Sequence, residues 1–290
     1  MSQIAQLHDY EHFLARKSFI ELNAAARAAA LLDPGSQRVL LGPFDRLKSP
    51  WLPLQGIVPE SDDGVVILRG TIDGAPAVIA AIESAFQGGS MGEVSGAKIA
   101  GALELALLDH EKGLPTHPVI LFETGGVRLQ EANLGLAVIA EIHAAIIALR
   151  PHTPVVGVIA GMVGCFGGMS LAASLCSHLI VTPQARLGMN GPEVIEQEAG
   201  VQELDSSDRR LIWSLIGGEQ RWATDLVDTL VEDDADAIAA AVRKVFAAGV
   251  QGVPRSAQVD NYRAKLAAFD PSLPADPKAL RQTWTRGDSQ

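Results

Sequence analysis

The sequence predicts an α/β fold in which strands alternate with helices from residue 64 to residue 248. The expected strands are short apolar runs such as residues 118–122 and 155–159. Their lack of polar alternation is typical of strands that are covered on both faces. Each of these two runs leads into a pair of glycines and then into a helical pattern. We therefore expect a sheet that lies between layers of helices.

The composition supports a large core and excludes several classes of partner. Of the 290 residues, 48% are hydrophobic and 20% are charged, and the formal net charge is −11. The basic residues are scattered, which argues against nucleic acid as a partner. No 18-residue stretch is purely apolar, so we expect no membrane span.

The two cysteines, Cys165 and Cys176, lie in apolar surroundings and form no C-x-x-C motif. We expect both to be reduced core residues, which fits a cytoplasmic protein. The N-terminus has no apolar signal segment. Two cysteines cannot build a four-cysteine zinc site, and no H-E-x-x-H motif occurs, so we expect no metal.

Hydrophobic spacing and turn residues place the elements along the chain. Residues 1–33 have a helical pattern, and the proline-punctuated residues 36–62 should be irregular with short strands. The strands that follow are expected at residues 65–68 (with a turn at Asp73-Gly74), 77–82, 118–122, 155–159, 178–181 and 227–231. The helices are expected at residues 94–111, 128–149, 169–176, 192–198, 206–216, 220–225, 234–247 and 256–269. We divide the chain into a helical arm (1–35), a main domain (36–250) and a helical tail (251–290).

The two strand–glycine–helix units predict two oxyanion holes made of backbone N–H groups. The candidate donors are Gly125 and Gly126 in the first unit and Gly167 and Gly168 in the second. Glycine lets a ligand approach the backbone closely, and a helix start offers unpaired donors and a positive dipole end. One such donor is worth roughly 3–4 kcal/mol in a transition state. Turns without a ligand remain the alternative.

Two further segments offer polar contacts. Arg128 and Gln130, in GGVRLQE, could contact a carboxylate or shape the turn, and the alternative is an ordinary capped helix start. The GGSMG loop at residues 88–92 matches G-x-S-x-G, and histidines that follow would allow a Ser–Asp–His triad. Because residues 84–87 separate this loop from its strand, we favour a substrate-contacting loop over a nucleophile elbow. Neither phosphate-loop nor dinucleotide-binding motifs occur.

Three segments carry a resemblance to a known family: GGSMGEVSGAKIAGALE, ETGGVRLQEANLGL and GCFGGMSLAASLCSHLIVTPQARLGMNGPEVIEQ. In this order they resemble the carboxyltransferase β-subunits of the crotonase superfamily, over roughly residues 84–232. The acetyl-CoA carboxylase β-subunit usually begins with a four-cysteine zinc ribbon, which this chain cannot build. In its length and its ETGGVRLQE segment the chain is most similar to the β-subunits of malonate decarboxylases.

The resemblance implies a crotonase-like ββα spiral, with residues 36–250 as the carboxyltransferase domain. It further implies a homologous γ-subunit with the active site at the interface, an acyl carrier protein and an acyl-carrier transferase subunit. The substrate would be a malonyl thioester on the CoA-like (phosphoribosyl-dephospho-CoA) arm of the carrier, with no cofactor bound directly. Loss of CO2 would leave an enolate held by the two glycine turns. The implied substrate contacts are Gly88, Gly89, Ser90, Met91, Arg128, Gln130, Gly164 and Gly191.

Two other functions share these motifs. One is a carboxyltransferase subunit that passes the carboxyl group to or from biotin. The other is a non-catalytic half of a heteromeric complex, whose partner carries the chemistry. The glycine turns do not separate these alternatives from decarboxylation.

Overall fold

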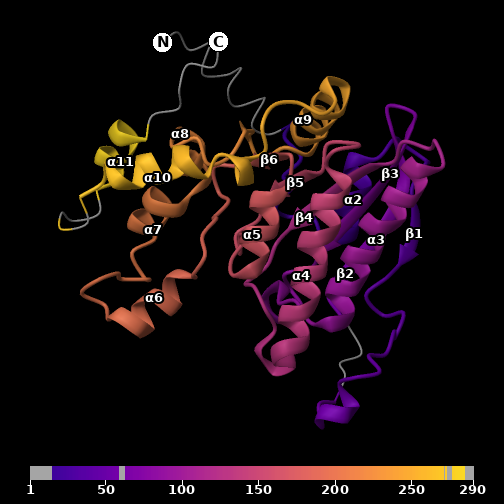
Figure 1. Ribbon diagram of the computed structural model, residues 1–290, viewed down its shortest axis with the longest axis horizontal. Coiled ribbons are helices and arrows are strands. Elements are labelled where there is room, and N and C mark those ends of the chain that lie inside the picture. Colours follow the sequence, from indigo (N-terminus) through magenta and orange to yellow (C-terminus); the bar gives the residue numbers. More distant parts are fainter. Residues whose placement is uncertain (1–14, 59–62, 271, 273–275, 285–290) are drawn as a thin grey trace.

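The computed structural model describes residues 15–58, 63–270, 272 and 276–284, and its ribbon is drawn in Figure 1. The strands are β1 (Arg38–Leu41), β2 (Val65–Ile72), β3 (Ala75–Ile82), β4 (His117–Phe122), β5 (Val156–Ile159), β6 (His178–Val181) and β7 (Thr229–Leu230). The helices that pack on the sheet are α2 (Ala24–Leu31), α3 (Glu93–Glu111), α4 (Ala132–Leu149), α5 (Gly168–Leu175) and α9 (Ala235–Ala248). The others are α6 (Pro192–Ala199), α7 (Arg209–Ile216), α8 (Gly218–Ala223), α10 (Val259–Ala267) and α11 (Pro277–Thr283). Four short 3₁₀ turns complete the elements: η1 (Pro53–Gln55), η2 (Gln87–Gly89), η3 (Leu129–Glu131) and η4 (Arg255–Ala257).

The seven strands form one sheet in the order of the sequence, from β1 to β7. The first three strands pair antiparallel, and the strands from β3 to β7 pair parallel. The β2–β3 hairpin turns at Asp73-Gly74, as the sequence predicted. Parallel neighbours require crossovers, and helices α3, α4 and α5 supply the three between β3 and β6. The expected α/β alternation is confirmed.

Helices cover both faces of the sheet. Figure 1 shows α3, α4 and α5 side by side in front of the sheet, with α2 behind it and α6, α7, α8, α10 and α11 gathered to the left. Along β3, Val78, Ala80 and Ile82 belong to the core under α3–α5, whereas Ala77, Ile79 and Ala81 belong to the core under α2 and α9. Successive strand residues point to opposite faces, so a fully apolar strand supplies two cores.

Two predicted helices begin later in the structure than the sequence suggested. The predicted helix at 1–33 is wrong over residues 16–23, because α2 starts only after Asn23, whose side chain accepts the Ala26 N–H; residues 1–14 lie outside the described part. The helix predicted from residue 128 begins at residue 132, after η3.

The tail holds two helices where the sequence suggested one. The second, α11, starts with Asp276 as its cap and a proline in its first turn, a start signal that the prediction missed. The division into arm, main domain and tail stays a prediction. No helix in the described part of the chain combines the length and apolarity that crossing a membrane requires.

Helices α3 and α4 pack closely because α3 has glycine where they cross. A Cβ built on Gly96 would overlap Val138 Cγ1 of α4. Gly101, one and a half turns further along α3, has no atom within 4 Å of such a Cβ. The two glycines thus share a helix and differ in their surroundings.

We expect Gly96→Ala to lower the free energy of unfolding by about 1–3 kcal/mol, because the added methyl group forces the two helices apart. Gly101→Ala should raise it by about 0.5–1 kcal/mol, because alanine restricts the unfolded chain and fits the open position. Urea unfolding monitored by circular dichroism measures both. Equal effects for the two variants would contradict the proposed crossing contact.

Candidate active site

The predicted glycine loops meet at one edge of the sheet. Strands β3, β4 and β5 run parallel, so their carboxyl ends lie at the same edge, where ligand sites of open α/β sheets form. The loops that leave these ends carry residues 83–92, 123–131 and 160–167. The crossovers therefore bring together three segments that are about forty residues apart in the sequence.

The first two loops pair through their backbones. The Met91 N–H donates to Gly126 O over 2.8 Å, and the Arg128 N–H donates to Met91 O over 2.7 Å. This is the pattern of a parallel bridge, which is found between Met91 and Val127. The loop at residues 88–91 is thus part of the same edge as the first glycine turn.

The second and third loops pair in the same way. The Thr124 N–H donates to Gly164 O over 2.8 Å, and the Phe166 N–H donates to Thr124 O over 3.1 Å. Further bridges join Cys165 to Leu187. A small second layer of extended backbone therefore lies beyond the main sheet and carries both glycine turns.

The two turns approach so closely that a side chain on either glycine would press against the other turn. Gly126 has φ +111° and Gly167 has φ +59°, both in the region that favours glycine. A Cβ built on Gly126 would lie 3.3 Å from Phe166 O, and one built on Gly167 would lie 3.2 Å from the Gly126 Cα. Glycine is favoured at both positions by its backbone angles, and a Cβ at either one would require the neighbouring turn to shift.

The amides of the first turn are mostly used inside the protein. The Gly125 N–H donates to Gly88 O over 2.9 Å, and the Gly126 N–H donates to Thr124 Oγ1 over 3.0 Å. Among the described residues, the Val127 N–H has no acceptor. The turn therefore offers the amide after the glycine pair to a ligand.

In the second turn, too, one amide is hydrogen bonded inside the protein and the following ones are not, within the described residues. The Gly167 N–H donates to Met189 O over 2.7 Å. Gly168 and Met169 are the first two residues of α5, and their N–H groups have no acceptor in the described part of the chain. They lie at the positive end of the helix dipole, which favours a negative oxygen.

The predicted substrate contacts differ in their accessibility. The Arg128 side chain is 3% exposed, and its guanidinium binds Glu131 Oε1 at 2.9 Å and Ser90 O at 2.9 Å and lies over the Phe86 ring. Arg128 thus holds the turn in place, which is one of the two roles that the sequence suggested for it. Gln130 is exposed, and Met91 is fully buried.

The remaining predicted contacts are glycines of the loops. Gly89 lies where a Cβ would overlap Glu123 O, and Gly164 lies where one would overlap Arg186 O. Gly88 accepts the Gly125 N–H, and Gly191 precedes α6 and accepts from its first turn. Their contact with a substrate stays a prediction.

Ser90 does not have the surroundings of a hydrolase nucleophile. Its hydroxyl accepts from Arg128 Nε at 3.3 Å, and no described histidine hydrogen bonds to it. It follows the 3₁₀ turn η2 and precedes α3 by two residues, so no strand runs directly into it. An elbow requires that strand–turn–helix order.

The buried cysteines are poor nucleophiles. Burial raises the pKa of the Cys165 thiol well above its usual range, and it raises the pKa of the Cys176 thiol to about 12. Both thiols are free. Among the described residues, no group of three or more His, Cys, Asp or Glu side chains is arranged to hold a metal ion. The chemistry available at this edge is that of backbone donors.

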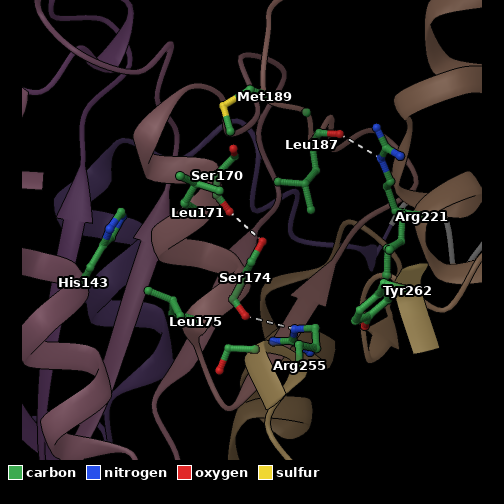
Figure 2. A pocket seen from close by; sticks show the side chains of 13 residues that line it. His143, Ser170, Leu171, Ser174, Leu175, Leu187, Met189, Arg221, Arg255 and Tyr262 are labelled. Atoms are coloured by element: carbon green, nitrogen blue, oxygen red, sulfur yellow. Dashed lines mark hydrogen bonds between the residues drawn. The ribbon is translucent and has the colours of Figure 1, made fainter. Parts of the chain in front are cut away.

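A pocket of about 590 Å³ adjoins the second turn (Figure 2). Figure 2 shows α5, which carries Leu171 and Leu175, between His143 on one side and Arg221 on the other. The walls are mostly apolar, and the described part of the chain gives Arg221 no carboxylate partner. Burial accordingly lowers the pKa of Arg221 to about 10, while its Nε donates to Leu187 O.

Sequence reasoning missed three features of this edge. His143 of α4 donates from Nε2 to Gly168 O at 3.0 Å, which fixes the tautomer because a carbonyl only accepts. Met189 holds the second turn through its backbone. Glu123 is 2% exposed directly after an apolar strand. A lone carboxylate between an apolar run and paired glycines is the signal that could have found it.

Comparisons with known proteins agree with this geometry. The carboxyl transferase domain family matches residues 21–286. The malonyl-S-ACP:biotin-protein carboxyltransferase MADC of Malonomonas rubra is 35% identical over 96% of this chain and 91% of its own length. A Pseudomonas malonate decarboxylase hetero-tetramer in complex with malonate contains a chain that is 58% identical, with a TM-score of 0.89 over 95% of this chain and 100% of that one.

A third comparison extends the likeness beyond malonate enzymes. The transcarboxylase 12S structure with methylmalonyl-coenzyme A and methylmalonic acid bound has a TM-score of 0.64 and 30% identity, over 78% of this chain and 40% of that chain. The crotonase-like carboxyltransferase fold inferred from the sequence motifs is thereby confirmed. With its family pattern matched along most of its length, this chain belongs to the carboxyl transferase domain family.

Proposed function

We propose that this chain is the β-type subunit of a malonate decarboxylase, an enzyme that releases CO2 from a malonyl thioester. The observation that carries the proposal is the 58% identity and TM-score of 0.89 to a chain of a malonate decarboxylase hetero-tetramer. The Val127 and Gly168 N–H groups, which have no acceptor in the described part of the chain, are donors of the kind that such a reaction requires.

In the proposed reaction the bond between the carboxylate carbon and the α-carbon breaks. Its electron pair moves into the thioester as an enolate, CO2 leaves, and a proton then completes the acetyl thioester. The negative charge that develops on the thioester oxygen is what the outward amides of Val127 or Gly168 would stabilise. Two donors aimed at that oxygen would lower the barrier by about 5–8 kcal/mol, since fixed donors act mainly on charge that appears during reaction.

The same proposal assigns partners and carrier. The hetero-tetramer relative supports a heteromeric assembly, and we infer a homologous γ-subunit, an acyl carrier protein and an acyl-carrier transferase subunit. The malonyl group would arrive on the CoA-like arm of the carrier. The pocket of about 590 Å³ that Ser170 and Met189 help to line supports this, because its apolar walls offer room for such an arm. We also propose a cytoplasmic location, consistent with the two free thiols.

A second candidate function is favoured by one relative. The chain is 35% identical to a malonyl-S-ACP:biotin-protein carboxyltransferase, in which the carboxyl group goes to biotin instead of leaving as CO2. Both reactions pass through the same enolate, so the same turns serve both. The fate of the carboxyl group distinguishes them.

We expect Gly168→Pro to lower kcat of the assembled complex by about 10²–10³-fold, because proline removes the outward N–H while its fixed φ suits the first position of α5. Gly168→Ala is the matched control: its Cβ meets Ile139 in the same way, but its N–H remains. Steady-state CO2 release measures both variants. If the folded proline variant turned over like the alanine variant, this turn would not carry the reaction and the non-catalytic alternative would gain support.

Release of labelled CO2 from carboxyl-labelled malonyl thioester separates the two reactions. We expect release only when the chain is combined with its partner subunits, and the same rate with and without avidin, because free decarboxylation needs no biotin. Inhibition by avidin would assign the chain to the biotin-dependent carboxyltransferases.

A further inference from the structure

Glu123 lies between the two glycine turns and is one of the most buried charged residues of the chain. It directly follows β4 and is 2% exposed. Its backbone precedes the first turn, and its carbonyl oxygen fills the space where Gly89 would otherwise carry a Cβ. Its side chain crosses to the loop that leads into the second turn. One residue thus contacts all three loops of the edge.

The carboxylate of Glu123 is held by N–H donors on both oxygens. Oε1 accepts from the Val163 N–H at 2.7 Å and from the Gly164 N–H at 3.3 Å, while Oε2 accepts from Arg27 Nη1 at 2.9 Å. Every one of these neighbours is a donor, so the ionised form is the one that fits. Burial raises the pKa of Glu123, and the Arg27 charge opposes that rise.

The Glu123 carboxylate occupies the space beside Gly161, in the loop at residues 160–167, where a side chain would otherwise lie. A Cβ built on Gly161 would overlap Glu123 Oε2, although the backbone of Gly161 has ordinary angles that any residue could adopt. The need for glycine at this position is therefore steric. The Glu123 carboxylate is therefore packed directly against the backbone of the loop at residues 161–164.

Arg27 connects the site to the opposite layer of the fold. It belongs to α2, is 8% exposed, and also donates to Phe19 O at 2.9 Å and Ile20 O at 2.6 Å. The N–H groups of Phe19 and Ile20 in turn donate to Asp233 Oδ1 at 2.8 and 2.9 Å. A continuous chain of charge-assisted hydrogen bonds thus runs from the start of α9 to the second glycine turn.

We infer that Glu123, paired with Arg27, is a positioning residue that sets the loop at residues 160–168 so that the Gly168 N–H faces the reacting thioester. The inference rests on the proposed function, because the group that it positions is the proposed enolate donor. Gly164, which the carboxylate holds, also accepts the Thr124 N–H, so the same contact fixes the spacing of the two turns.

Small shifts of this loop should have large effects on rate. Fixed donors are useful only when they are aimed at the oxygen that gains charge, and a misplacement of about 1 Å costs about 100-fold. Binding of the carrier arm depends on a much larger surface, so KM should change little. A loss of kcat without a change in KM is the signature of an interaction that is made only in the transition state. A loss of folded enzyme would lower the apparent kcat in the same way, so the experiment also needs a variant that is destabilised elsewhere.

Two variants perturb the contact by different routes. Glu123→Gln keeps an oxygen for the loop amides and places an NH2 group opposite Arg27. Gly161→Ala keeps the carboxylate and displaces it sterically, so it serves even if Glu123→Gln does not assemble. Ile79→Ala is the control, because Ile79 is fully buried in the core under α2 and lies within β3, outside the three loops.

In the assembled complex, at a temperature where all variants are folded, we expect Glu123→Gln and Gly161→Ala to lower kcat about 10–100-fold with KM within about 3-fold. Amide hydrogen exchange of residues 160–168 should become faster in both. Ile79→Ala should lower the melting temperature at least as much and leave kcat and this exchange unchanged.

Unchanged kcat in folded variants, or a loss that Ile79→Ala reproduces, would overturn the inference. A wild-type complex that releases no CO2 would refute the proposed function instead. The exchange measurement would then still decide whether Glu123 sets the loop, since it needs no substrate, and unchanged exchange at residues 160–168 would count against it.

Discussion

The close approach of two backbones at Gly126 and Gly167 is the constraint on which the candidate site depends. The two turns come from different crossovers and lie so close that a Cβ on either glycine would be in tight contact with the other turn. Such proximity is possible only because β4 and β5 are parallel neighbours whose carboxyl ends reach the same edge. The sheet therefore sets the distance between the turns, and the glycines allow that distance to be short.

At the two turns, the donors that have no acceptor in the described part of the chain are backbone amides. The two arginines buried beside the turns, Arg27 and Arg128, are each paired with a carboxylate, Glu123 and Glu131. Their charges are largely balanced before any substrate arrives. Amide dipoles fixed by the fold need no reorganisation when an oxyanion forms, whereas a mobile side chain would have to move or lose water.

The α/β alternation and the glycine turns were predictable from the sequence, because apolar runs and paired glycines are local signals. The assignment of donors within the turns was not. From the sequence, Gly125 and Gly167 were candidate donors to an oxyanion. In the structure their N–H groups donate to Gly88 O and Met189 O, which belong to other loops. Only the folded chain shows that the amides without an acceptor among the described residues include those of Val127 and Gly168, which follow Gly126 and Gly167.

Helix starts failed for a similar reason. The sequence places Glu131 near the first turn of its own helix, whereas its carboxylate accepts the Glu93 N–H at the start of α3. Residues 18–20 have helical spacing, but Asp233 binds the Phe19 and Ile20 amides in a turn. At residues 18–20 a carboxylate distant in sequence thus competes with a local helix for its backbone donors, whereas the Glu131 carboxylate caps a helix other than its own.

The attachment of the α2 segment to the beginning of α9 has a consequence for how the chain folds. The Lys17 and Ala235 backbones bond to each other across more than two hundred residues, and Asp234 accepts the Lys17 N–H. During synthesis the segment that leads into α2 therefore cannot make these contacts until residue 235 has left the ribosome. Until then one face of β2 and β3 lacks its final cover, so this apolar surface is the part of the nascent chain most exposed to aggregation.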